Sequence, residues 1–213
     1  YNSLMNIEIK RSIKPVNYLD AVKFLEERID KINQNSANEL IWILEHPSTF
    51  TAGASFTEND ILDKSINIIK TSRGGKITWH GPGQLVCYLV INLNKRQKDI
   101  RKFLNIIENS IIVSLKSFGI NSYSDKKNIG IWTQLNNEEK KIGAIGIKVK
   151  RWITYHGFSL NINNDISNYK KIIPCGIKNK GVTTLKKIED QNYNKLSELI
   201  IENLIINLKT LVS

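Results

Sequence analysis

The sequence predicts a single domain of the α+β (mixed α/β) class, with a mixed, largely antiparallel sheet and helices packed against it. Its 213 residues suit one substantial domain and are few for two. No internal repeat, low-complexity tract or Pro/Gly/Ser linker divides the chain. Strand-like segments gather between three amphipathic helices instead of alternating regularly with them. We therefore expect one domain over residues 1–213.

The first elements are an edge strand, a helix and a buried strand. Residues 5–13 alternate loosely between apolar and polar side chains, which is typical of an edge strand. The next segment places apolar residues on one helical face: Tyr18, Ala21, Val22, Leu25, Ile29 and Ile32. Residues 40–44 form an apolar strand that ends before Pro47, because proline restricts the preceding residue to extended geometry. A polar loop is expected over residues 51–55.

Later elements show the same alternation of strands and the same apolar faces of helices. Residues 84–93 are expected to form a largely apolar strand, and residues 129–162 contain further strand-like segments. Between them lies a helix that Gly119 ends, with the apolar face Ile100, Phe103, Leu104, Ile107, Ile111, Leu115 and Phe118. A terminal amphipathic helix over about 192–212 has the apolar face Leu196, Leu199, Ile200, Leu204, Leu208 and Leu211.

The composition is basic, with 31 Lys plus Arg against 20 Asp plus Glu and a net charge of +11. Such a surface indicates an anionic partner, or else a compositional bias, because the lysines are spread along the chain. The lysine-rich stretches lack interleaved aromatic residues, which argues against nucleic acid. No apolar stretch is long enough to cross a bilayer, and residues 1–16 lack a secretory pattern. We expect no membrane association, and a location in the cytoplasm or an organelle.

The segment 73–84 (RGGKITWHGPGQ) carries the strongest functional signal. Four glycines and a proline exclude a regular helix, since each is unfavourable in a helix interior. Glycine permits positive φ and lets the backbone approach another group closely. Arg73 and His80 lie among these glycines, which suggests that the group approached is a ligand. The pattern is neither GxGxxG nor GxxxxGK[ST], so it gives no support for nucleotide binding.

Cys175 is the candidate nucleophile, because Pro174 and Gly176 present it on a turn. The alternative is a small buried hydrophobic residue, which describes most cysteines. Cys87 lies inside an apolar strand and is interpreted as core. Without an export signal, both are expected to be reduced thiols.

A cysteine nucleophile needs a nearby base or cation, because a free thiol has a pKa of about 8.5. Lys141 lies in a glycine-bearing apolar strand, where partial burial favours proton exchange, although most lysines are solvated. The three histidines, His46, His80 and His156, are further candidates. No His, Cys or carboxylate cluster has metal-ligand spacing, so neither a metal nor another cofactor is expected.

Together these motifs resemble the lipoyl(octanoyl) transferase family. The matching blocks, from about residue 40 to 177, are EHP at 45–47, Thr51 with Gly53, RGGxxxxHGPGQ at 73–84, KIxxIG at 141–146, HGFSLN at 156–161 and PCG at 174–176. The resemblance implies a biotin/lipoate-protein-ligase-like fold. It implies transfer of octanoyl from octanoyl-acyl carrier protein to a lysine of lipoyl domains, in 2-oxoacid dehydrogenase E2 subunits and the glycine-cleavage H protein, as the first step of lipoate biosynthesis.

The resemblance also implies residue roles. Cys175 would hold the acyl group as a thioester and Lys141 would be the paired acid/base. The residues implied to line the acyl site are Arg73, Gly74, Gly75, Lys76, Ile77, Thr78, Trp79, His80, Ala144, Ile145, Gly146, Gly157, Phe158 and Ser159.

Three alternatives remain. An ATP-dependent lipoate or biotin ligase of the same fold needs a lysine but no cysteine nucleophile. A lipoyl amidotransferase would share the Cys/Lys chemistry and differ in its donor. A non-catalytic basic module would bind nucleic acid in a salt-sensitive way and form no acyl-enzyme.

Overall fold

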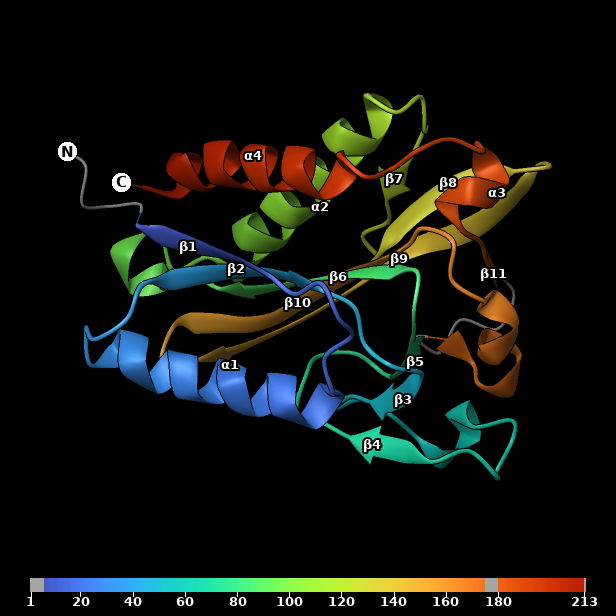
Figure 1. Ribbon diagram of the computed structural model, residues 1–213, viewed down its shortest axis with the longest axis horizontal. Coiled ribbons are helices and arrows are strands. Elements are labelled where there is room, and N and C mark those ends of the chain that lie inside the picture. Colours follow the sequence, from blue (N-terminus) through green and yellow to red (C-terminus); the bar gives the residue numbers. More distant parts are fainter. Residues whose placement is uncertain (1–5, 175–179, 213) are drawn as a thin grey trace.

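The computed structural model describes residues 6–174 and 180–212. Cys175 and Gly176, the expected nucleophile and its neighbour, lie outside the described residues. The described chain forms a mixed α/β domain in which helices cover both faces of a central sheet (Figure 1).

The central sheet is mixed and largely antiparallel, as the sequence predicts. In the described ranges its spatial order is β1 (Ile7–Arg11), β2 (Glu39–Leu44), β6 (Gln84–Val90), β10 (Ile153–Asn161), β9 (Glu138–Lys150), β8 (Ile131–Leu135) and β7 (Tyr123–Ser124), with β11 (Gly181–Val182) beside β9. The β1–β2 and β11–β9 pairs are parallel, and the other neighbours are antiparallel.

Two layers of helix bury the faces of this sheet (Figure 1). Helix α1 (Tyr18–Asn33) covers one face, where its apolar side chains pack on those of β2 and β6. Helices α2 (Ile100–Lys116) and α4 (Leu196–Leu208) lie together on the other face, and the short α3 (Leu185–Ile188) precedes α4. The terminal helix expected to reach Leu211 changes after Leu208 into a 3-10 turn, Lys209–Leu211, and Leu211 stays buried.

A second, three-stranded sheet lies at one end of the domain (Figure 1). Its order is β4 (Ile68–Lys70), β3 (Thr49–Ala52) and β5 (Ile77–His80). The expected polar loop over residues 51–55 is therefore wrong at its start, because Thr51 and Ala52 are buried strand residues paired with β5. The small sheet has its own core, formed with Tyr169 and Ile172 of the segment that leads to Pro174.

Candidate functional site

Arg73 fixes the glycine-rich segment to the small sheet. Its guanidinium donates hydrogen bonds to the Thr51 hydroxyl at 3.2 and 2.9 Å, to the Thr51 carbonyl at 2.8 Å and to the Gly74 carbonyl at 2.9 Å. A Cβ added at Gly53 would lie 2.3 Å from the Gly75 carbonyl oxygen, so only glycine fits against this loop. Arg73 is therefore a brace for the loop backbone.

The loop backbone also lies against the central sheet. A Cβ on Gly74 would come within 2.9 Å of the Ile147 carbonyl oxygen, and one on Gly146 within 2.9 Å of the Gly74 carbonyl oxygen. On β10, a Cβ on Gly157 would lie 1.9 Å from the Cys87 carbonyl oxygen. These close approaches explain why glycines recur at these positions.

A cavity of about 50 Å³ opens between the glycine-rich segment, β9 and β10. Twelve of the expected acyl-site residues line it: Arg73, Gly74, Gly75, Lys76, Thr78, His80, Ala144, Ile145, Gly146, Gly157, Phe158 and Ser159. Segments more than 80 residues apart in the chain thus meet at one place. Four lining residues lie outside the set that the resemblance implied for the acyl site: Tyr18, Val86, Tyr88 and His156.

Ile77 and Trp79 face the other way. Both are buried in the core of the small sheet, and Trp79 Nε1 donates to the Ser48 hydroxyl at 3.0 Å. Successive side chains of a strand point to opposite faces, so Thr78 and His80 are the β5 residues on the cavity side. The sequence motif did not separate the two faces, since no strand was expected there.

Lys141 lies at the other end of the site, and only 5% of the surface of this residue is exposed. Its ammonium donates to the Ile129 carbonyl at 3.0 Å and lies 5.4 Å from the centroid of the Trp132 ring. A narrow cavity holds Lys141 together with Pro174, and it shares Thr78, Ala144 and Ser159 with the cavity above. The two cavities therefore adjoin.

The described chain on both sides of residues 175–179 lies beside Lys141. Pro174 lines the same narrow cavity as Lys141. After the gap, Val182 pairs with Lys141 in β9, and the Thr183 amide donates to the Lys141 carbonyl at 3.0 Å. Lys180 anchors this return through ion pairs to Glu139 at 2.7 Å and Asp125 at 3.8 Å.

The three histidines are buried, His80 and His156 in the cavity wall and His46 behind it, and all are poor bases. Burial lowers the pKa of His46, and it lowers the pKa values of His80 and His156 to about 3. His46 Nδ1 donates to the Val16 carbonyl at 2.6 Å, so its Nε2 accepts from the Tyr88 hydroxyl at 2.6 Å. His80 Nδ1 donates to the side-chain oxygen of Gln84 at 2.7 Å. All three rings are uncharged at neutral pH.

Cys87 is fully buried, and burial raises the pKa of its thiol far above the usual range. Its interpretation as a core residue is therefore confirmed. Residues 6–174 and 180–212 contain no grouping of three His, Cys, Asp or Glu side chains placed to hold a metal. In the same ranges, none of the helices has the length and apolarity needed to traverse a bilayer.

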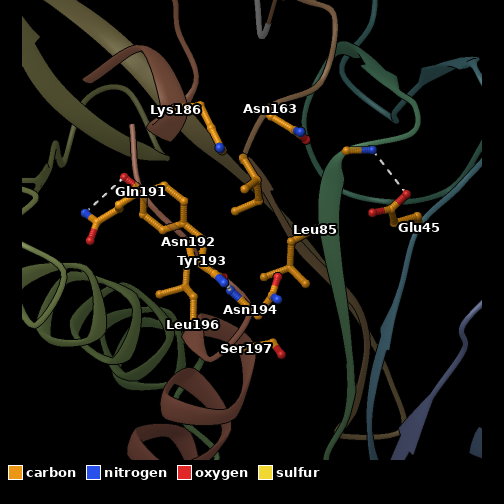
Figure 2. Close-up of a pocket in the computed structure, with 12 residues that line it drawn as sticks. Glu45, Leu85, Asn163, Lys186, Gln191, Asn192, Tyr193, Asn194, Leu196 and Ser197 are labelled. Carbon is orange, nitrogen blue, oxygen red and sulfur yellow. Dashed lines mark hydrogen bonds between the residues drawn. The ribbon is translucent and has the colours of Figure 1, made fainter. Parts of the chain in front are cut away.

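A separate hollow of about 530 Å³ lies between the turn before β6 and the start of α4 (Figure 2). Glu45 borders it and accepts a 3.1 Å hydrogen bond from the Gly83 amide. Asn163 lies beside Gly83, and the side-chain amides of Gln191, Asn192 and Asn194 supply the opposite wall. This hollow contains neither Lys141 nor the cavity-facing residues of β5, so it is distinct from the site described above.

Comparison with known proteins shows the family of this chain. Residues 17–204 match the model of the lipoyl protein ligase A/B catalytic domain. Proteins named octanoyltransferase are similar to the chain: one from Wolbachia sp. subsp. Brugia malayi (strain TRS) is 48% identical over 81% of this chain and 85% of its own. One from Ehrlichia canis (strain Jake) is 43% identical over 85% of this chain and 86% of its own.

Solved structures of low identity share the fold. The bipartite lipoate protein ligase of Thermoplasma acidophilum superposes with a TM-score of 0.72 at 12% identity, over 96% of this chain and 85% of that one. The biotin protein ligase of Aquifex aeolicus with biotin and ATP gives 0.56 at 15% identity, over 97% and 72%. The expected biotin/lipoate-protein-ligase-like fold is confirmed, and the chain belongs to the lipoyl protein ligase A/B catalytic-domain family, among the octanoyltransferases.

Proposed function

We propose that this protein transfers an octanoyl group from octanoyl-acyl carrier protein to a lysine of lipoyl domains, through a thioester on Cys175. The observation that carries the proposal is Lys141, a buried ammonium beside the glycine-walled cavity. Pro174 and Val182, on either side of residues 175–179, both lie beside Lys141, which supports pairing Lys141 with the Cys175 thiol. Relatives at 40–48% identity carry the name octanoyltransferase, which supports the acyl group.

In the first half-reaction, Lys141 holds the proton of the Cys175 thiol as an ammonium beside the thiolate. The thiolate attacks the thioester carbonyl of the donor, and a tetrahedral oxyanion forms. Collapse of this species breaks the donor C–S bond, and the departing donor thiolate takes the proton from the Lys141 ammonium. One thioester is exchanged for another, so the step needs neither ATP nor an oxidant.

In the second half-reaction, the ε-amine of the acceptor lysine attacks the Cys175 thioester. Lys141 accepts a proton from the attacking nitrogen and returns one to the Cys175 sulfur as the C–S bond breaks. An amide replaces the thioester. Within the described residues, Lys141 donates to Ile129 alone, which leaves two of its three N–H donors for these transfers.

The cavity walls suit an acyl chain. Gly74, Gly75, Gly146 and Gly157 expose backbone to the chain without side chains of their own. Each methylene that leaves water contributes about 0.8 kcal/mol. The cavity has a volume for only about three water molecules, so entry of eight carbons requires the lining side chains to move apart.

The partners are proposed to be acidic carrier proteins: octanoyl-acyl carrier protein as donor, and lipoyl domains of 2-oxoacid dehydrogenase E2 subunits and the glycine-cleavage H protein as acceptors. Exposed Lys170 and Lys187 border a hollow of about 740 Å³ that reaches Pro174. Cations at this position would attract an acidic partner toward the mouth of the site. We assign the reaction to the cytoplasm or an organelle.

Intact-mass spectrometry tests the proposal. The purified protein is incubated with octanoyl-acyl carrier protein in the absence of ATP, and the wild type should gain the mass of one octanoyl group. Cys175→Ala should gain none, whereas the matched control Cys87→Ala should gain it as the wild type does, because Cys87 is buried in the core. An adduct on Cys175→Ala would remove the thiol from the mechanism, and a requirement for ATP would favour a ligase.

A further inference from the structure

His156 is a buried polar side chain that the mechanism does not use. It is 1% exposed and lines the acyl cavity. Neither ring nitrogen has a hydrogen-bond partner among the residues that the structure describes. The ring is uncharged, since burial and the nearby Arg73 lower its pKa to about 3. A neutral imidazole offers one donor and one acceptor, so both require a partner from within the cavity.

The backbone turns this ring toward the cavity. Residues on β10 alternate between the two faces of the sheet: Tyr155 packs on the α1 side and Phe158 on the α2 and α4 side. Alternation alone would place His156 with Phe158. Instead His156 has φ +60°, and its ring lies 6.2 Å from that of Tyr88, which lines the cavity. A positive φ at a residue other than glycine is unfavourable, and such residues cluster at functional sites.

An eight-carbon chain fits the span from Ser159, where the two cavities adjoin, to His156. Ser159 belongs to both the Lys141 cavity and the acyl cavity, and it lies three strand residues from His156. Three strand residues span roughly 10 Å. An extended chain advances roughly 1.2 Å per bond, so the seven bonds of an octanoyl group span roughly 8 Å. An extended octanoyl tail that begins near Ser159 therefore ends just short of the imidazole.

We propose that His156 is the specificity-determining residue that limits the acyl chain to about eight carbons, by making the inner end of the cavity polar. A chain of eight carbons leaves the ring nitrogens open to water or to a polar atom. A longer apolar chain covers them and leaves a buried donor and acceptor unpaired. The inference rests on the proposed function in one respect, namely that the acyl carbonyl lies at the Lys141 end.

The test is the affinity for free fatty acids of six, eight, ten and twelve carbons, measured by calorimetry below their critical micelle concentrations. In a uniformly apolar cavity, each further methylene raises affinity about fourfold. For the wild type, we expect affinity to rise in this way up to eight carbons and to stay constant for longer acids. This change of slope at eight carbons is the break in the affinity series. A wild-type affinity that keeps rising fourfold per methylene to twelve carbons overturns the proposal.

Two substitutions separate polarity from size, and both residues tolerate positive φ. His156→Gly removes the ring nitrogens, so affinity should rise through twelve carbons, to about tenfold or more above the wild type for the longest acid. His156→Asn keeps a polar group and should keep the break at eight. Loss of the break in both variants would mean that ring size sets the limit, which overturns the proposal, as would a break retained in His156→Gly.

Tyr155→Phe is the matched control. Its ring stacks on His156 at 4.8 Å but does not line the cavity, so the break should stay at eight carbons. Binding involves no transfer, so a protein that selects chain length without forming an acyl-enzyme contradicts only the proposed function. A protein that transfers octanoyl with a break independent of residue 156 contradicts only this inference, and so does a wild type that binds none of the acids.

Discussion

The Lys141 ammonium donates a 3.0 Å hydrogen bond to the carbonyl oxygen of Ile129, which lies just before β8 in the chain. The next residue, Gly130, has φ +146°, and a Cβ there would lie 2.4 Å from Lys141 Cε and 2.8 Å from the Gly143 carbonyl oxygen. The Lys141 side chain therefore passes directly over a glycine to reach its acceptor. Ile129 and Gly130 together determine where this ammonium lies.

Gly130→Ala is expected to displace Lys141 and to slow acylation of the enzyme. General acid–base catalysis contributes typically 10²–10⁴-fold, so a misplaced base should lower the single-turnover rate constant by roughly tenfold or more. Rapid quenching followed by mass spectrometry measures this constant. Gly119→Ala is the matched control: Gly119 also has positive φ, but its added Cβ meets nothing within 4 Å, so acylation should be unchanged. If both variants slowed acylation equally, backbone strain at a glycine of positive φ would explain the loss, and displacement of Lys141 would not.

Lys141→Ala should slow acylation and shift the pH profile of Cys175 alkylation toward higher pH. Removal of a nearby cation leaves the thiolate without electrostatic support, so a higher pH is needed to form it. The rate of iodoacetamide labelling, followed from pH 5 to 10 by mass spectrometry, gives this profile. Buried Cys87 should remain unlabelled in the folded protein. An unchanged profile would exclude Lys141 from the proposed dyad.

Arg73→Lys should destabilise the protein by about 2–3 kcal/mol, although the charge is retained. Arg73 donates to Thr51 and Gly74 through three nitrogens, and an ammonium cannot reproduce this planar arrangement. Urea unfolding followed by far-UV circular dichroism measures the loss. Lys70→Ala, also at the small sheet, is the control, because Lys70 is exposed. A free energy of unfolding within 0.5 kcal/mol of the wild type, roughly the range of surface substitutions, would mean that Arg73 is not a brace.

Stability should fall as the pH is lowered from 7 to 5. Histidine binds its proton near pH 6.5 when unfolded, whereas His80 and His156 do so near pH 3 in the folded protein. The unfolded state therefore binds more protons between pH 6.5 and 3, so the free energy of unfolding decreases with falling pH. Each ring should contribute about 2 kcal/mol between pH 7 and 5. Urea unfolding at both pH values tests this. His156→Asn should lose one ring's share of the pH dependence, and an unchanged wild-type stability would contradict the assignment.

Raising the salt concentration should increase the apparent KM for octanoyl-acyl carrier protein more than it lowers kcat. Interactions between exposed charges are screened at high ionic strength, and Lys170 and Lys187 are exposed near the proposed entrance. Steady-state kinetics between about 0.05 and 0.5 M salt measure the effect. Kinetics that do not respond to salt would mean that the net charge of +11 is compositional.

The sequence by itself determined the fold class, the main helices and most strands of the central sheet. These features are visible in the order of residues because glycine, proline and apolar periodicity act locally. The set of acyl-site residues came instead from the resemblance of the motifs to the lipoyl(octanoyl) transferase family. It missed β5, since the residues Ile77 to His80 lie between glycines that suggest only a loop. Pairing with Thr49–Ala52 makes this segment a strand, so its side chains alternate between the core of the small sheet and the cavity wall.

Tertiary structure alone decided which side chains surround the site. Tyr18 belongs to a helix face that the sequence assigns to the core, yet its position at the start of α1 places it at the cavity. His156 faces the cavity because its φ departs from that of a regular strand. The Ile129 carbonyl reaches Lys141 because β8 pairs with β9, with a register shift between Ile131 and Trp132. Contacts between distant segments depend on register and backbone dihedrals, which short-range sequence patterns do not specify.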